Sequence, residues 1–285
     1  MSDTVHAVPN AAQIESWNGA AGQTWTQFQD QLDRQIDPLG QEALRTLVPA
    51  TGEQLLDIGC GCGQTSWQLA QRVGLDGAVL GVDVSQSMLQ AARQRTDLPS
   101  PLAPLFLHGD VQLTDLGAAR FDGAFSRFGV MFCADPVAAF ANVLRALKPG
   151  GRLVFVCWRS LAQNIWMRVP LEAAQPFLPA TAPPDPHAPG PFALADAARL
   201  RTVLTQAGFA EVTLRAFDCL VGASDLDASL SLALRVGPLG SVLRESPALE
   251  ASIAAPVRAA LGRHVHAGVV RMGGAAWIVS ARRSI

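Results

Sequence analysis

The sequence predicts an α/β fold with a mainly parallel sheet covered by helices on both faces. Two observations lead to this prediction. From residue 54 onward, short apolar runs alternate with longer amphipathic segments, a pattern typical of strands joined by crossover helices. A glycine-rich turn at 59–63 lies between the first apolar run and the first amphipathic segment. Right-handed crossovers then place the strands in one sheet whose two faces are both covered.

The elements follow in order along the chain. Residues 11–48 have apolar side chains at spacings near three and four and are predicted to be helical. Proline and glycine in 49–52 end this region. The predicted strands are 54–58, 78–82, 105–108, 121–125, 152–158, 211–215 and 274–280. The predicted helices are 64–73, a segment that starts near Ser85, and 136–147, 195–207, 225–245 and 248–262.

A proline-dense stretch at 176–191 interrupts this alternation. It has too many prolines for a helix interior and too few hydrogen-bond donors for a sheet. Because strand and helix signals resume after it, we expect an ordered lid loop rather than a linker. The prediction is therefore one domain over 1–285, with an N-terminal helical segment (1–48), a core (49–160), and a last part with the lid, cap helices and final strands (161–285).

Composition excludes several classes of function. Of 285 residues 49% are hydrophobic, and the formal net charge is -2, so no bulk positive field attracts nucleic acid. The five cysteines are odd in number, no secretory signal is visible in the first ten residues, and no apolar run approaches 18 residues. We expect a reduced, cytoplasmic protein without a membrane span. Tyrosine is absent, which excludes a phenol as acid, base or nucleophile.

The segment from Asp57 to Ser66 carries the main functional signal. Its pattern is acid-x-G-x-G-x-G, whereas dinucleotide-binding loops use G-x-G-x-x-G, which counted from Gly61 needs glycine where Ser66 stands. Asp57 would repel a pyrophosphate and suits a ligand with positive charge. The sequence therefore favours a nucleoside with a cationic amino-acid tail, and an atypical dinucleotide loop of a nicotinamide oxidoreductase remains the alternative.

Two further acidic residues follow strand ends. Asp83 ends the second predicted strand, where such folds place the carboxylate that accepts the ribose hydroxyls. Such an aspartate can also serve only as a helix cap, although Ser85 is available for that purpose. Asp110 follows the third strand and either accepts from an exocyclic amine of the base or is a simple turn residue.

The runs LLDIGCGCGQTS, VLGVDVSQSML, HGDVQ and FDGAFSRFGVMFCADPVAAFANVLRALKPGGRLVFVCWR together resemble the class I S-adenosylmethionine-dependent methyltransferases over about residues 50–160. More narrowly, they are similar to the bacterial small-molecule branch related to ubiquinone and menaquinone methyltransferases. WNGAAGQTW (17–25) and GPFALAD are similar to a less characterised bacterial subgroup. The resemblance implies a Rossmann-like, seven-stranded sheet in the order 3-2-1-4-5-7-6, with the last strand antiparallel.

The resemblance also implies S-adenosyl-L-methionine as cofactor. It assigns cofactor binding to Asp57, Gly59, Gly61, Gly63, Gln64, Thr65, Asp83, Val84, Met88, Asp110, Val111 and Ser126. In this assignment the glycine loop holds the methionine moiety, Asp83 takes the ribose, and Asp110 with the amide of Val111 reads the adenine edge. Ser126 and Arg127 lie beneath the amine and the sulfonium.

The expected function is methyl transfer from this cofactor to a small, largely apolar metabolite, by in-line positioning and desolvation. His187 in the lid and Arg127 are the candidates for catalytic work. Five aromatic residues are the candidates for an apolar acceptor pocket that also favours the sulfonium: Trp17, Trp25, Phe128, Trp158 and Trp166. No metal site is expected, because the closely spaced His264 and His266 lack further ligands nearby.

Two other functions keep the cofactor but not the reaction. One is an intramolecular cyclase or lyase that consumes S-adenosylmethionine without an acceptor, and the other is a non-catalytic S-adenosylmethionine-binding protein. The sequence leaves open the acceptor, the methylated atom, the use of a general base and the oligomeric state.

Overall fold

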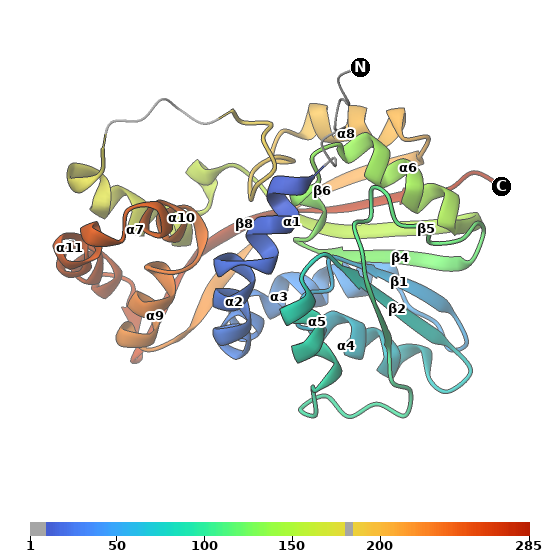
Figure 1. Ribbon diagram of the computed structural model, residues 1–285, viewed down its shortest axis with the longest axis horizontal. Coiled ribbons are helices and arrows are strands. Elements are labelled where there is room, and N and C mark those ends of the chain that lie inside the picture. The colour runs from blue at the N-terminus through green and yellow to red at the C-terminus, as the bar shows by residue number, and fades with distance from the viewer. Residues whose placement is uncertain (1–9, 180–184) are drawn as a thin grey trace, which may run out of the picture.

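One mixed sheet organises the molecule (Figure 1). The computed structural model describes residues 10–179 and 185–285. In these residues the sheet has the order β3-β2-β1-β4-β5-β8-β6, and β7 pairs with β8. The strands are β1 (Gln54–Ile58), β2 (Ala78–Asp83), β3 (Leu105–His108), β4 (Phe121–Arg127), β5 (Leu147–Trp158), β6 (Ala210–Ser224), β7 (Val265–His266) and β8 (Val269–Arg282). Because β8 is the seventh predicted strand and pairs antiparallel with β5 and β6, the predicted order is confirmed.

Helices cover both faces of this sheet. One face carries α3 (Gln29–Leu47), α4 (Gln64–Val73) and α5 (Gln86–Arg93). The other carries α6 (Pro136–Ala146) and α8 (Ala197–Gln206). Two short helices, α1 (Ala11–Asn18) and α2 (Ala20–Gln27), lie near the start of α5. The 3-10 helices are η1 (Val130–Phe132), η2 (Leu161–Gln163), η3 (Gln175–Phe177) and η4 (Pro247–Leu249).

The remaining helices form a cap at the end of the molecule away from β1–β3 (Figure 1). We use "cap" for α7 (Ile165–Ala174), α9 (Leu226–Ala233), α10 (Gly237–Glu245), α11 (Glu250–Gly262) and the ends of β6 and β8 that reach them. Its apolar centre includes Leu239, Ile253 and Val257, all 2% exposed or less. Trp166 packs against both this cluster and the main core around the sheet.

Local chemistry explains where the elements of the core begin. Ser85 caps α5 by accepting a hydrogen bond from the Met88 amide (3.4 Å), and Asp135 caps α6 by accepting from the Ala138 amide (2.9 Å). Pro136 occupies the first turn of α6, where its missing N–H is not needed. β1 and α4 have the predicted bounds 54–58 and 64–73. The apolar run, the glycine-rich turn and the amphipathic segment that predict these bounds follow one another directly in the sequence.

The largest differences from the prediction concern four elements. The helical region 11–48 is three helices, broken at Gly19 and Phe28. The helix 225–245 is two helices that meet at 57°, because Gly237 has a φ of 76° and Pro238 has no N–H to donate. β6 and β8 are much longer than predicted, because two antiparallel strands pair with each other and so continue beyond the parallel part of the sheet.

The lid prediction falls partly on residues 180–184, which lie outside the described residues. Its later part packs against the core. The Gly190 amide donates to the Met131 carbonyl (3.1 Å), and the Trp277 indole donates to the carbonyl of Ala195 (2.9 Å). Leu194 is 1% exposed, so this part of the lid is anchored by η1 and β8. In the described residues no single helix has the length and apolarity to cross a membrane, although α9 and α10 taken together do.

Candidate cofactor and acceptor site

The loops that follow β1 and β4 cross in direct backbone contact. Gly59 has a φ of 63°, and a Cβ built on it would lie 2.6 Å from the Cα of Gly129. No side chain fits at this crossing, and residues other than glycine rarely adopt such a φ. The glycine requirement at 59 therefore has a steric cause, because only glycine lets the two loops pack backbone against backbone.

Asp57, at the end of β1, is fully buried. Its Oδ2 accepts hydrogen bonds from the hydroxyls of Thr65 (2.7 Å) and Ser66 (2.6 Å) at the start of α4. Its Oδ1 is buried without a hydrogen-bond partner among the described residues. Burial raises the pKa of Asp57 from 3.8 to about 6, although the two hydroxyls and the charge of Arg127 oppose this shift. Its free oxygen can therefore accept a hydrogen bond from a cationic ligand group.

The first turn of α4 adds backbone N–H groups, which donate hydrogen bonds, whereas the carboxylate of Asp57 accepts them. Gly63 precedes this helix with a φ of 82°, and no side chain caps the N-terminus. The first N–H groups of a helix have no intrahelical acceptor and carry the positive end of the helix dipole. A group with both an ammonium and a carboxylate thus finds a partner for each, at Asp57 and at the start of α4.

Asp83 joins the glycine loop to the turn that follows β2. Its Oδ2 accepts from the Gly61 amide and its Oδ1 from the Ser85 amide, both at 2.8 Å. Burial raises the pKa of Asp83, whereas these two amide hydrogen bonds lower it. Each carboxylate oxygen can accept a further hydrogen bond, so capping and ribose binding are compatible here. Met88 is buried in α5, with its Cε 2.9 Å from a Cβ built on Gly61.

The turn at Val84 is covered by the N-terminal helices. The side chain of Asn18, the last residue of α1, donates to the Val84 carbonyl (2.7 Å) and accepts from the Gln86 amide (3.1 Å). The same carbonyl lies 2.9 Å from Nε2 of His108. The sequence analysis assigned no role to Asn18, although it lies within the WNGAAGQTW motif. It fixes the α1–α2 pair over the part of the site predicted to bind ribose and base.

Asp110 and Val111 are both buried after β3. The two oxygens of Asp110 accept from the backbone and side-chain amides of Gln112 (3.0 and 2.9 Å). The Val111 carbonyl accepts from the side-chain amide of Asn142 (2.6 Å). The structure thus explains Asp110 as a turn residue, and its predicted contact with adenine stays a prediction.

Ser126 and Arg127 end β4 beside the glycine loop. The Ser126 hydroxyl donates to the Ile58 carbonyl (2.7 Å) and accepts from the Gly129 amide (3.2 Å), which fixes the two crossing loops. The Arg127 guanidinium donates to the Gln64 side-chain oxygen and to Oδ1 of Asp33 in α3 (2.9 Å). Arg127 is therefore close to the loop but already paired, and a catalytic role for it stays a prediction.

The predicted pocket aromatics form two groups. The rings of Phe128 and Trp158 stack with centroids 4.0 Å apart, and Trp166 lies 5.3 Å from Trp158. Trp17 packs edge to face with Trp25 at 5.9 Å, and with Phe132 at 5.0 Å. Phe128 has a φ of 64°, a conformation that costs about 1–3 kcal/mol in a residue other than glycine. The backbone strain lies directly beside Gly129, where the two loops cross.

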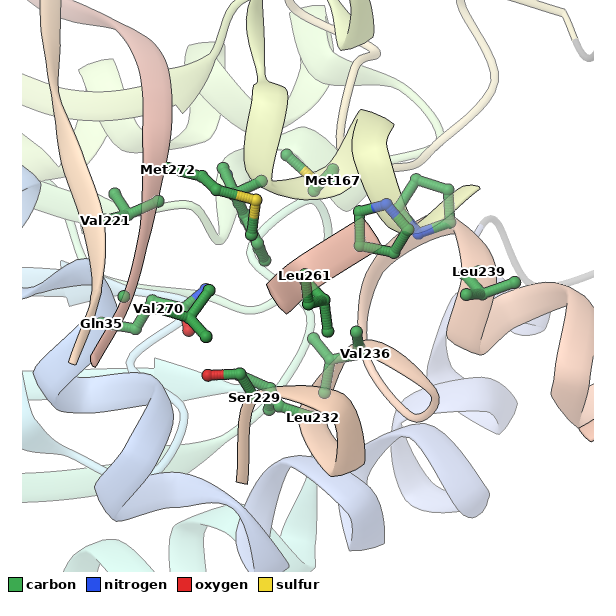
Figure 2. Close-up of a pocket in the computed structure, with 15 residues that line it drawn as sticks. Gln35, Met167, Val221, Ser229, Leu232, Val236, Leu239, Leu261, Val270 and Met272 are labelled. Atoms are coloured by element: carbon green, nitrogen blue, oxygen red, sulfur yellow. The ribbon is translucent and has the colours of Figure 1, made fainter. Parts of the chain in front are cut away.

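A cavity of about 30 Å³ lies where the aromatic row reaches the cap (Figure 2). Apolar side chains dominate its lining, which includes Trp166, Leu261 and Met272. Figure 2 shows the amide end of Gln35, from α3, directed into this cavity, and Gln35 is 8% exposed. The Nε1 of Trp166 is buried without a hydrogen-bond partner in the described chain. The cavity thus combines apolar walls with a few polar groups.

His187 lies in an exposed turn of the lid, where its backbone amide donates to the Asp185 carboxylate (2.8 Å). Its role as a catalytic base stays a prediction. Burial raises the pKa of Cys62 and of Cys133 to about 12, so neither thiol is activated. Among residues 10–179 and 185–285, no group of three or more histidines, cysteines and carboxylates is arranged for a metal ion.

Fold and loop together define the class I S-adenosylmethionine-dependent methyltransferase architecture. Residues 56–155 match the family model described as a methyltransferase domain. This match confirms the resemblance proposed from the motifs, and residues 56–155 form a methyltransferase domain. The glycine loop and the ends of β1, β2 and β4 all lie inside the matched segment.

Similar sequences include several methyltransferases. The aklanonic acid methyltransferase DauC of a Streptomyces species is 32% identical, over 41% of this chain and 54% of that protein. The O-methyltransferase cnsE of Penicillium expansum is 35% identical, over 41% and 42%. The demethylmenaquinone methyltransferase of Lactococcus lactis is 28% identical, over 43% and 49%. The matched segment thus spans about half the length of these curated relatives.

Similar solved structures support the fold over most of the chain. The YcgJ protein from Bacillus subtilis has a TM-score of 0.58 at 15% identity, covering 87% of this chain and 99% of that one. The [4+2]-cyclase SpnF has a TM-score of 0.54 at 22% identity, covering 87% and 82%. At these identities the likeness concerns the fold alone.

Proposed function

We propose that this chain transfers the methyl group of S-adenosylmethionine to a small, largely apolar metabolite. The observation that carries the proposal is the unpartnered Oδ1 of Asp57, buried beside the uncapped start of α4. Glycines at 59, 61 and 63 keep the same loop free of side chains, since a Cβ at each would lie within 3.0 Å of a neighbouring atom. This arrangement suits the ammonium and carboxylate of a methionine tail and is unfavourable for a pyrophosphate.

The residues of the chain divide the binding of this cofactor between them. Asp57 accepts from the ammonium, and the amides of the first turn of α4 bind the carboxylate. Asp83 accepts from the ribose hydroxyls with the lone pairs that Gly61 and Ser85 leave free. Asp110 and Val111 read the adenine edge. Asn18 fixes α1 and α2 over the turn at Val84 and so limits access of water.

When bound, the cofactor supplies a methyl group that its sulfonium has already activated. The protein's main contribution is then orientation, which can account for roughly 7–11 kcal/mol of barrier reduction. Phe128 and Trp158 stack on each other beside the crossing loops. Their apolar rings exclude water, and a ring face turned away from the stack favours a cation. A general base enters only if the acceptor must lose a proton, and His187 is the residue to test for it.

The acceptor pocket we infer follows the aromatic row from Phe128 to Trp166 and continues into the cap cavity. Its apolar walls favour an apolar molecule, and Gln35 and Trp166 favour one that carries an oxygen. The relatives named for aklanonic acid and demethylmenaquinone fit this class of acceptor. A cavity of about 30 Å³ holds one or two water molecules, so the cap must open before the acceptor enters.

The proposal has a two-stage test. Thermal unfolding of the full chain with S-adenosylmethionine, S-adenosylhomocysteine or NADH should show stabilisation by the first two ligands only. Mass spectrometry after incubation with apolar phenols and quinols should show a methylated product together with S-adenosylhomocysteine. Methylthioadenosine in place of S-adenosylhomocysteine would instead support a cyclase or lyase that needs no acceptor. Stabilisation by NADH alone would exclude the proposed cofactor.

We also propose a cytoplasmic location and a single domain for this chain. All five cysteines lie in described residues and are free thiols, which fits a reducing compartment such as the cytoplasm. β6 and β8 run through both the core and the cap, which supports a single domain over 1–285.

A further inference from the structure

A buried ion cluster lies beneath the glycine loop. Oδ2 of Asp33, in α3, is 2.6 Å from the Arg95 guanidinium, and its Oδ1 is 2.9 Å from that of Arg127. The three side chains are 8%, 6% and 10% exposed. One carboxylate thus pairs with two arginines, which come from the loop after α5 and from the end of β4.

Both arginines also contact the glycine loop or the start of α4. Arg95 donates to the Cys62 carbonyl (3.0 Å), and Arg127 donates to the Gln64 side-chain oxygen. Asp33 itself lies near enough to Cys62 to help raise the pKa of that thiol, after burial. The cluster is therefore in contact with both ends of the segment 62–64, next to the predicted methionine site.

The charges of this cluster affect whether a cationic or a neutral ligand binds next to it. S-adenosylmethionine has a sulfonium cation, whereas S-adenosylhomocysteine has a neutral thioether and is otherwise the same. Two uncompensated guanidinium groups at this depth would repel the sulfonium but not the thioether. Arg95 has a second partner in Asp97, which is 60% exposed and therefore screened by water. Among the described residues, Asp33 is the carboxylate that forms an ion pair with Arg127.

We propose that Asp33 is a positioning residue that sets the charge beneath the glycine loop and thereby allows the sulfonium form of the cofactor to bind. This inference rests on the proposed function. Asp33 accomplishes this through Arg127 and Arg95, and it needs no contact with the ligand. Its consequence is that the charged substrate is not disfavoured relative to the neutral product.

The test compares the affinities of both ligands in four variants of the full chain by calorimetry. Asp33→Asn should weaken S-adenosylmethionine about tenfold more than S-adenosylhomocysteine, because one buried anion is lost. Arg127→Gln keeps the Asp33–Arg95 pair and should change the ratio of the two affinities in the opposite direction, in favour of S-adenosylmethionine. The double variant, which loses one charge of each sign, should return the ratio toward that of the unmodified protein.

Asp37→Asn is the matched control. Asp37 lies one turn further along α3 and accepts hydrogen bonds from the neutral side chains of Gln41 and Gln68, so its loss should leave the ratio unchanged. Equal weakening of both ligands in the Asp33 and Arg127 variants would overturn the inference and leave Asp33 a purely structural residue. If Asp33→Asn does not fold, the ratio of the two ligand affinities in Arg127→Gln tests the inference by itself. Failure of the unmodified protein to bind either ligand would instead overturn the proposed function.

Discussion

Asp57 in the glycine loop and Gln35 at the cap cavity are both buried polar side chains, but their surroundings differ. Asp57 has two hydroxyl donors within nine residues of sequence and lies near Arg127, which pairs with Asp33. Gln35 faces apolar side chains that come from α7, α9, α10, α11, β6 and β8. The surroundings of Asp57 are suited to a charged group, whereas the surroundings of Gln35 are suited to an apolar group of matching shape.

The two regions therefore suit different ligands, as proposed above for the cofactor and the acceptor. A cofactor with fixed charges needs hydrogen-bonding groups at fixed positions, so those groups come from short loops at the ends of parallel strands. An apolar acceptor needs a cavity with few polar groups, and long antiparallel strands with a helical cap provide it. The following substitutions should separate the two regions.

The largest expected effect is that of Gly59→Ala. A Cβ there meets the Gly129 Cα at 2.6 Å, so the free energy of unfolding should fall by about 3 kcal/mol or more, and cofactor binding should be lost. Gly52→Ala is the control, because Gly52 also has a positive φ (84°) but no atom within 4 Å of its Cβ position. Urea unfolding should give a loss of only about 1 kcal/mol for it. Similar losses in both variants would show that the crossing of the two loops is unimportant.

Asp57→Asn should weaken cofactor binding about 100-fold and yet stabilise the protein. Burial raises the pKa of Asp57 from 3.8 to about 6, so above pH 6 the ionised folded state is disfavoured. Removing the charge should raise the free energy of unfolding by about 2–3 kcal/mol at pH 8. This gain should shrink as pH falls from 6 to 4 and vanish below pH 4, where the carboxyl is protonated in both states. Urea unfolding at several pH values checks this, and a variant less stable at pH 8 would contradict it.

Gln35→Leu should separate the cap from the cofactor site. Replacing an amide that faces an apolar cavity should raise the free energy of unfolding by about 1 kcal/mol and leave the affinity for S-adenosylhomocysteine within twofold. Gln31→Leu, one turn earlier in α3, is the control: its side chain donates to the Ala228 carbonyl (3.0 Å), so this variant should be destabilised. Thermal unfolding and calorimetry measure both effects. A loss of cofactor affinity in Gln35→Leu would mean that the two regions are coupled.

The smallest effect is expected for Asn18→Ala. It removes the two hydrogen bonds that fix α1 and α2 to the turn at Val84, at a cost of about 1 kcal/mol. Affinity for S-adenosylhomocysteine should fall a few-fold, and amide hydrogen exchange should rise in 11–27. Exchange that is unchanged there would show that other contacts hold these helices in place.

The same contrast explains how much could be predicted from the sequence. β1 and α4 could be predicted, because Asp57, the glycines and the apolar runs lie within short stretches with defined geometry. The sheet order was predicted only through the resemblance to the class I methyltransferases. Asp33 could not, because a charged residue on an amphipathic helix has the same pattern whether it faces water or buried arginines. The break between α9 and α10 and the long β6–β8 pairing depend on tertiary contacts, and for the same reason the cap cavity and Gln35 were not predicted.

The central claim is that ionised Asp57 accepts from the ammonium of an S-adenosylmethionine-type ligand. Calorimetric titration of the full chain with S-adenosylhomocysteine between pH 5 and pH 8 tests it most directly. The account predicts one site per chain and an affinity that falls about tenfold from pH 7 to pH 5, as a carboxyl with a pKa of about 6 becomes protonated, with no such dependence in Asp57→Asn. An affinity independent of pH, or binding of a nicotinamide dinucleotide in place of this ligand, would contradict it.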